Sequence, residues 1–77
     1  MGIDMQSLLI RSKEEKLKLE MIYMTGQGEL SQRVIRVINV YDHSILAYCF
    51  TRRKVRKFTN KNILSVLPYR KKRHIGA

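Results

Sequence analysis

Hydrophobic and polar positions alternate with a period of two along most of the chain, which is the pattern of half-buried β-strands. Residues 16–24 show the alternation most clearly, with apolar side chains at Leu17, Leu19, Met21 and Tyr23. Later segments are rich in β-branched and aromatic residues, and they predict strands over 31–41, 44–51, 55–58 and 63–67. The pattern therefore predicts a series of strands that fills the chain after residue 15.

The segment before these strands predicts a short helix. Asp4 can cap the orphan amides of a first turn, and the leucines at 8–9 supply an apolar edge. We expect this helix to end around Lys13. Gly26 and Gly28 lie in the turn after the first strand, where each can adopt a positive φ.

One short helix followed by five strands in 77 residues predicts a mainly β domain, folded as a strongly bent antiparallel sheet or a small barrel. Closure into a barrel would also protect the strand edges. One boundary stands out, at Pro68, where the strand pattern gives way to a basic run. We expect a single domain over 1–68 and a basic, flexible C-terminal tail over 69–77.

The charge of the chain is strongly one-sided. The formal net charge is +10, and residues 1–42 contribute none of it, because they hold six Lys and Arg against six Asp and Glu. Residues 43–77 hold ten Lys and Arg and no Asp or Glu. A field of this kind attracts polyanions. It favours nucleic acid, a nucleotide or an anionic lipid surface, and the lipid surface ranks last because no basic amphipathic helix is present.

Several protein classes conflict with the composition. No apolar run approaches the roughly 18–20 residues that cross a bilayer, and the first residues lack the pattern of a secretory signal. The single cysteine, Cys49, excludes an intramolecular disulfide framework, and Cys49, His43 and His74 have no metal-ligand spacing. We therefore expect a cytoplasmic protein without membrane insertion, metal or cofactor.

The sequence also offers no catalytic constellation. Residues 43–77 cannot supply paired carboxylates, because they contain no Asp or Glu. Cys49 lies in the middle of a predicted strand with no His or acidic neighbour in sequence, which favours a buried structural thiol. The turn around Gly26 and Gly28 is too short for a phosphate-binding loop. We expect a binding protein and not an enzyme.

The strongest local signal for binding lies in residues 48–58, where five cations are interleaved with three aromatic residues. Guanidinium groups pair with phosphates, and aromatic faces stack on bases. This mixture suits a single strand better than a duplex, because bases must be exposed to stack. The candidate binding residues here are Tyr48, Arg52, Arg53, Arg56 and Lys57. Alternatively, the aromatic residues belong to the core and the cations form a solvated loop.

A second basic cluster lies at the C-terminal end of the chain. It consists of Arg70, Lys71, Lys72 and Arg73. Four phosphates neutralised by this run would give a salt dependence with a slope of magnitude about 3 to 4. Alternatively, the run is a solubilising tail or contacts an anionic protein.

The order of these elements, with the residues on them, resembles the WYL domain of bacterial regulators. The resemblance spans about residues 8–67. Its marks are an apolar-x-apolar-x-Tyr strand ending at Tyr23, a glycine-containing turn, Arg33 at the start of the next strand, Ala47-Tyr48-Cys49, Arg56-Lys57-Phe58 and Asn62-Ile63. The chain departs from the family in lacking the Trp-Tyr-Leu tripeptide and in having Asn62 where the family has Arg.

The resemblance implies a five-stranded SH3/Sm-like barrel with a basic, aromatic cleft for nucleic acid or a nucleotide. It implies that Arg33 and Arg56 lie at this cleft, and we expect Tyr23, Tyr48 and Arg52 to line it with them. Alternatively, the aliphatic stems of the two arginines cover an edge of the barrel while their charged heads remain in water.

The sequence is compatible with two functions. The first is a non-enzymatic binding module for single-stranded nucleic acid or a nucleotide, in a regulatory or accessory role. The second is a protein-interaction module that docks its basic face on an acidic partner, because the same fold hosts many functions. In either case an open sheet edge could pair with a second copy in a homodimer.

Overall fold

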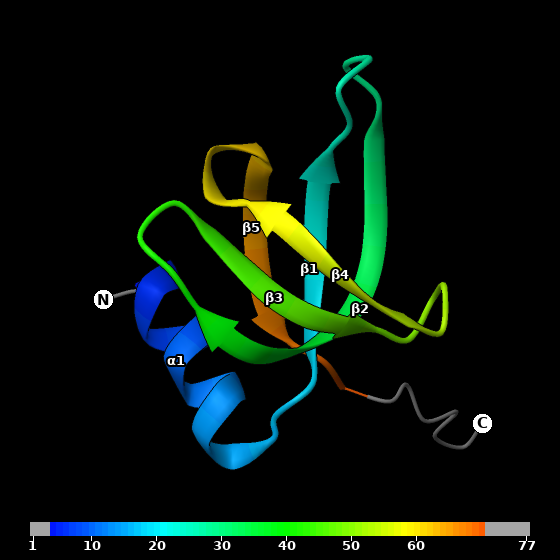
Figure 1. The fold of residues 1–77 in the computed structure, drawn as a ribbon. Helices are drawn as coiled ribbons and strands as arrows, with labels where there is room; N and C mark the ends of the chain where they lie inside the picture. The colour runs from blue at the N-terminus through cyan, green and yellow to red at the C-terminus, as the bar shows by residue number, and fades with distance from the viewer. Residues whose placement is uncertain (1–3, 71–77) are drawn as a thin grey trace, which may run out of the picture.

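The computed structural model describes residues 4–70, which form one helix and a five-stranded antiparallel sheet (Figure 1). The elements are α1 (Met5–Glu15), β1 (Leu19–Met24), β2 (Leu30–Val40), β3 (Ser44–Cys49), β4 (Lys54–Thr59), the 3₁₀ turn η1 (Asn60–Asn62) and β5 (Ile63–Pro68). The prediction of a mainly β domain with an N-terminal helix and five strands is therefore confirmed. No helix of residues 4–70 is long and apolar enough to cross a membrane.

The sheet is strongly bent but is not closed into a barrel. Its strand order is β4-β3-β2-β1-β5, so β1 to β4 follow one another as hairpins and β5 returns to pair with β1. Within residues 4–70, β4 and β5 are not paired with each other, and closure is the feature in which the structure differs from the expected barrel. The 3₁₀ turn η1 separates the two strands and directs β5 onto β1.

The curvature is visible in a contact across the sheet. Phe58 on β4 and Tyr23 on β1 have ring centroids 5.0 Å apart, although β3 and β2 lie between these strands in the sheet. Two register irregularities accompany the bend, between Val37 and Asn39 in the β2–β3 ladder and between Ile22 and Tyr23 in the β1–β5 ladder. Bulges of this kind increase local bending and twist.

The helix and the first turn differ in detail from the sequence prediction. Helix α1 extends to Glu15, and Lys16 ends it in the left-handed conformation (φ 56°) with its N–H donated to the Ser12 carbonyl. This termination delays the start of β1 to Leu19 instead of residue 16. Asp4 is extended at the N-cap, but its side chain makes no capping hydrogen bond. Only Gly28 of the two turn glycines has a positive φ, at 83°.

One buried hydroxyl fastens α1 to the sheet. The Ser12 Oγ donates a hydrogen bond to the Leu17 carbonyl (2.6 Å) and accepts one from the Val37 N–H (2.9 Å). Ser12 is fully buried, and its bond with the Val37 N–H forms away from water. Because Val37 adjoins the β2 bulge, the hydroxyl satisfies a backbone donor where the ladder is irregular.

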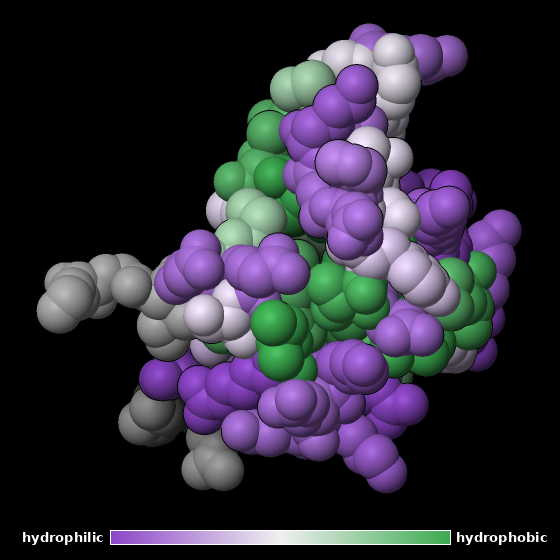
Figure 2. All heavy atoms as spheres, turned by 60° about the vertical axis from the view of Figure 1, so that its left-hand side comes forward, coloured by the Kyte–Doolittle hydropathy of each residue, from purple (hydrophilic) through white to green (hydrophobic). Residues whose placement is uncertain are grey.

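The outer surface is mixed in character. Figure 2 shows the side that carries α1, where apolar side chains lie in separate groups between hydrophilic ones. The exposed large apolar side chains come from the helix, from β2, from both edge strands and from the segments that follow β2 and β5: Ile10, Leu30, Ile38, Tyr41, Val55, Leu64, Leu67 and Tyr69. Scattered apolar residues of this kind are ordinary on a small domain.

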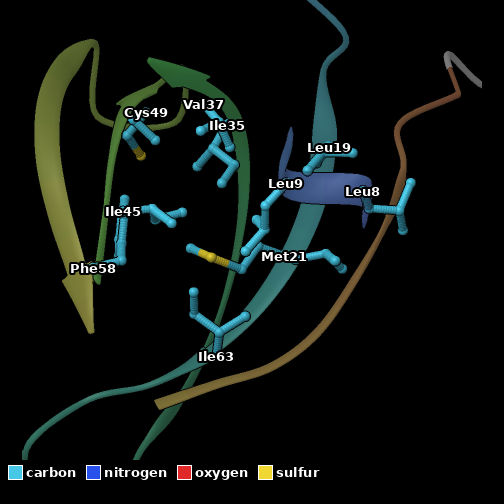
Figure 3. Close-up of a cluster of buried hydrophobic side chains, with 12 residues drawn as sticks. Leu8, Leu9, Leu19, Met21, Ile35, Val37, Ile45, Cys49, Phe58 and Ile63 are labelled. Atoms are coloured by element: carbon cyan, nitrogen blue, oxygen red, sulfur yellow. The ribbon is translucent and has the colours of Figure 1, made fainter. Parts of the chain in front are cut away.

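The core fills the space inside the bent sheet, and Figure 3 shows its side chains pointing toward one another from the helix and all five strands. Leu8 and Leu9 enter from α1, and the core members of β1, β2 and β3 occupy alternate positions, whereas Ile63 and Val66 on β5 are three residues apart across the irregularity of the β1–β5 ladder. The core members on the strands are Leu19, Met21, Ile35, Val37, Ile45, Ala47, Cys49, Phe58, Ile63 and Val66. We call the side of the sheet that carries them the concave side and the opposite side the convex side.

Candidate nucleic-acid interface

The strand alternation divides the predicted binding residues between the two sides of the sheet. Tyr23 and Arg33 lie on the concave side, because they are two residues from the core positions Met21 and Ile35. Arg56 is also on this side, opposite Ala47 in the β3–β4 ladder. Tyr48 and Lys57 point to the convex side, because each alternates with a buried neighbour. The predicted binding residues therefore do not line one common cleft.

Arg33 is the central residue of the concave side. Only 7% of it is exposed, and its Nε donates a hydrogen bond to the Ser31 Oγ at 3.0 Å. Its guanidinium carbon lies 5.8 Å from the centroid of the Phe58 ring. Tyr23 packs edge-on against the same ring, with an interplanar angle of 76°. We call these four residues, Tyr23, Ser31, Arg33 and Phe58, the Arg33 site.

The guanidinium of Arg33 is incompletely satisfied. Its Nη1 atom is buried and has no hydrogen-bond partner among residues 4–70. Within residues 4–70 the ion pair that forms is the exposed one between Arg11 and Glu15, and no carboxylate lies within ion-pair distance of Arg33. A buried cation without an anion is costly, and an unsatisfied buried donor alone costs about 1–3 kcal/mol. The cation–π contact with Phe58 offsets part of this cost.

An anion with oxygen acceptors would complete the Arg33 site. Arginine presents its donors in a planar fork that matches phosphate and carboxylate oxygens. Tyr23, which packs on the same Phe58 ring as the guanidinium, is only partly buried, so this part of the site reaches the surface. The site therefore combines an aromatic wall, a hydroxyl and an unpaired positive charge.

On the convex side, Tyr48 forms an aromatic pair with Phe50, which is not among the predicted binding residues. Its ring lies 4.9 Å from that of Phe50, at an interplanar angle of 79°. The Lys18 Nζ stands 4.4 Å above the Phe50 ring. Phe50 could have been found from its position two residues after Tyr48, since alternate residues of a strand share a face. Ser31 could have been found in the same way from Arg33.

The predicted arginines of the β3–β4 connection lie on an exposed turn. Arg52 and Arg53 directly precede β4, and both are exposed. Arg53 has a φ of 58°, in the left-handed region that glycine and asparagine occupy at lower cost. Arginine thus occupies a position where glycine or asparagine would cause less backbone strain. Strained positions of this type cluster at functional sites.

The remaining predicted residues lie at the end of the chain. Arg70 is exposed just beyond β5, and the Tyr69 N–H donates to the Lys18 carbonyl at 2.9 Å. Residues Lys71, Lys72 and Arg73 of the predicted basic cluster lie outside the described residues.

A hollow of about 430 Å³ lies apart from the predicted residues, where the β2–β3 turn meets η1. It is lined by Asp42, His43, Thr59, Asn60 and Lys61. The Asn60 Oδ1 atom is buried, and nothing in the described part of the chain hydrogen-bonds to it. Its lining mixes both charges, and it therefore lacks the uniform positive charge of the β3–β4 region.

Cys49 is a free, fully buried thiol, as the sequence predicts. It belongs to the core cluster beside Ile35, its partner in the β2–β3 ladder. In residues 4–70, no three His, Cys, Asp or Glu side chains come together as a metal-binding group.

No protein-family model matches the sequence, and no curated protein matches it. The geometry of the two sides of the sheet is therefore the basis for assigning a function.

Proposed function

We propose that this protein is a small, non-enzymatic, WYL-like module that binds single-stranded nucleic acid or a nucleotide in a regulatory or accessory role. The observation that carries the proposal is the buried guanidinium of Arg33, which has no anionic partner in the described residues and holds an unsatisfied Nη1. A phosphate oxygen is the acceptor that such a group lacks. The +10 charge of the chain supports the same ligand class, because it favours encounter with polyanions.

The phosphate enters the Arg33 site from the side of Tyr23. The exposed fraction of Arg33 accepts the first contact, and a shift of the partly buried Tyr23 ring gives the ligand access to Nη1. The cations of the β3–β4 turn and of β4 then neutralise neighbouring phosphates. Affinity for a strand therefore falls steeply as salt rises, because each neutralised phosphate releases counterions.

The test compares two arginines that contribute equally to net charge. Arg33→Met removes the buried guanidinium, whereas Arg11→Met removes an exposed one whose ion pair with Glu15 contributes little to stability. Each variant and the parent are titrated with a labelled poly-pyrimidine strand and with a nucleoside triphosphate, at two salt concentrations. Arg33→Met should weaken binding of at least one ligand about tenfold or more, and Arg11→Met about twofold or less. Equal effects of the two substitutions would refute the assignment of the site.

An acidic protein partner is the second candidate function, and the free edge of β4 favours it. In residues 4–70, β4 has a hydrogen-bonded neighbour only on its β3 side. Lys54, Arg56 and Lys57 lie along this edge strand. An extended acidic segment could add to it as a further strand. Binding of one protein at a fixed stoichiometry, with no affinity for oligonucleotides or nucleotides, would favour this function over the first.

A further inference from the structure

The convex side of the sheet is open. Helix α1 contributes Leu8 and Leu9 to the core cluster and therefore covers the concave side. In the described part of the chain, no second helix or sheet lies over the convex side. Tyr48 and Phe50 are both partly exposed there, and the neighbouring Val55 is 50% exposed. The rings of Tyr48 and Phe50 thus remain partly at the surface, although burying them would have enlarged this small core.

The geometry of the pair leaves ring surface available. Tyr48 and Phe50 meet edge to face, with interplanar angle 79°, so the two rings are not stacked on each other. Lys18 covers one side of Phe50 and places a positive charge 4.4 Å from its centroid. A base that stacks beside this contact would gain both a π-surface and a cation for its phosphate. We call Tyr48, Phe50 and Lys18 the Tyr48 platform.

The charges around the platform are mainly positive. Arg36 lies directly opposite Tyr48 on β2, and Lys57 lies on the same side of β4. The turn that carries Arg52 and Arg53 begins at Phe50 itself. The acidic residue on this side, Glu20, is engaged by the Gln32 side chain. The surface therefore fits a polyanion that also offers flat apolar rings.

We propose that the Tyr48 platform stacks the bases of a single-stranded nucleic acid on the convex side, as a surface separate from the Arg33 site. This inference rests on the proposed function and makes it more specific. Neighbouring strand residues point to opposite sides of the sheet, so a phosphate at Arg33 does not occupy the platform. A single strand uses both its bases and its phosphates here, whereas a duplex hides its base faces and binds through charge alone.

The experiment separates stacking from charge by using a strand without bases. The parent protein is titrated with a labelled poly-pyrimidine strand, an abasic strand of the same length and a matched duplex. The double variant Tyr48→Leu/Phe50→Leu keeps apolar side chains but removes the aromatic faces. Tyr41→Leu is the matched control, because Tyr41 is an exposed tyrosine in the β2–β3 connection, away from the platform. Circular dichroism and the urea midpoint establish that each variant is folded.

We expect the parent to bind the intact strand at least about tenfold more tightly than the abasic strand, since stacking contributes about fivefold to a hundredfold per base. The double variant should lose this preference, and Tyr41→Leu should retain it. Equal binding of intact and abasic strands by the parent would overturn the platform while leaving the proposed function intact. Persistence of the preference in the double variant would also overturn it. Failure of every strand to bind would overturn the platform, and the nucleotide titration then decides the fate of the proposed function.

A fluorescence measurement tests stacking at the platform without the double variant. The chain contains four tyrosines but no tryptophan, so Phe50→Trp introduces into the platform a single tryptophan whose fluorescence can be excited separately. A stacking base should quench it, and the abasic strand should leave it unchanged at the same occupancy. Quenching that is identical with both strands would contradict stacking at this position.

Discussion

The two sides of the sheet contain the same kinds of residue in opposite settings. On the concave side, Phe58 is 1% exposed and the cation beside it, Arg33, is 7% exposed. On the convex side, Phe50 is partly exposed and the cation above it, Lys18, is exposed. On the concave side the unusual feature is a buried charge, that of Arg33. On the convex side it is a partly exposed aromatic ring, that of Phe50. Each departs from what folding alone requires, and each points to a ligand that supplies what is missing.

The largest difference between the sides should appear in stability. Phe58→Ala removes a ring from the core and should cost about 3–5 kcal/mol of the free energy of unfolding, which approaches the whole stability of a domain this small. Phe50→Ala should cost about 1 kcal/mol or less, because its ring is partly exposed. Urea unfolding followed by circular dichroism measures both. Similar losses from the two substitutions would show that the convex ring is also structural.

The next largest loss of stability should come from loosening α1, which covers the concave side, from the sheet. Ser12→Ala leaves the Val37 N–H without its buried acceptor, and we expect a loss of about 1–3 kcal/mol. Ser7→Ala, at an exposed position of the same helix, is the control and should change stability by less than about 0.5 kcal/mol. Unchanged stability in Ser12→Ala would mean that water replaces the hydroxyl at little cost.

The strand pattern made most of the fold predictable from the sequence. Alternation placed Leu19 and Met21 in the core, and the β-branched segments located the remaining strands. The start of β1 was misplaced because the left-handed conformation of Lys16, which has no glycine signal, ends the helix. The open edge between β4 and β5 could not be foreseen, since closure depends on where η1 directs the chain and not on local pattern.

The candidate site was predictable by residue type but not by location. Arg33 and Tyr23 were selected through a family resemblance, and the structure brings them together on Phe58. Tyr48 was assigned to the same cleft, although its strand alternation places it on the other side. The number of cations and aromatic rings in a segment does not show which side of the sheet each one faces. Adjacent residues of a strand point to opposite sides.

A smaller effect tests whether Arg33 serves stability or binding. In the absence of ligand, Arg33→Met removes an unsatisfied donor and a buried charge, and it also removes the Ser31 bond and the cation–π contact. These effects oppose one another, so we expect the free energy of unfolding to change by about 1 kcal/mol or less in either direction. A loss of about 3 kcal/mol would instead identify Arg33 as a structural residue of the concave side. Urea unfolding in phosphate-free buffer provides the measurement.

The smallest effect concerns the turn between β3 and β4. Arg53→Gly should raise the free energy of unfolding by a few tenths of a kcal/mol, because relief of the left-handed strain slightly exceeds the added freedom of the unfolded chain. The same change should reduce the magnitude of the salt slope for single-strand binding by up to about 0.7, the contribution of one phosphate contact. Lys16→Gly is a matched control, because Lys16 is the other described non-glycine residue with positive φ and carries the same charge. It should gain stability to a similar extent but leave the salt slope unchanged. A gain in stability without a change of slope in Arg53→Gly would remove Arg53 from the interface and restrict phosphate contacts to the strands.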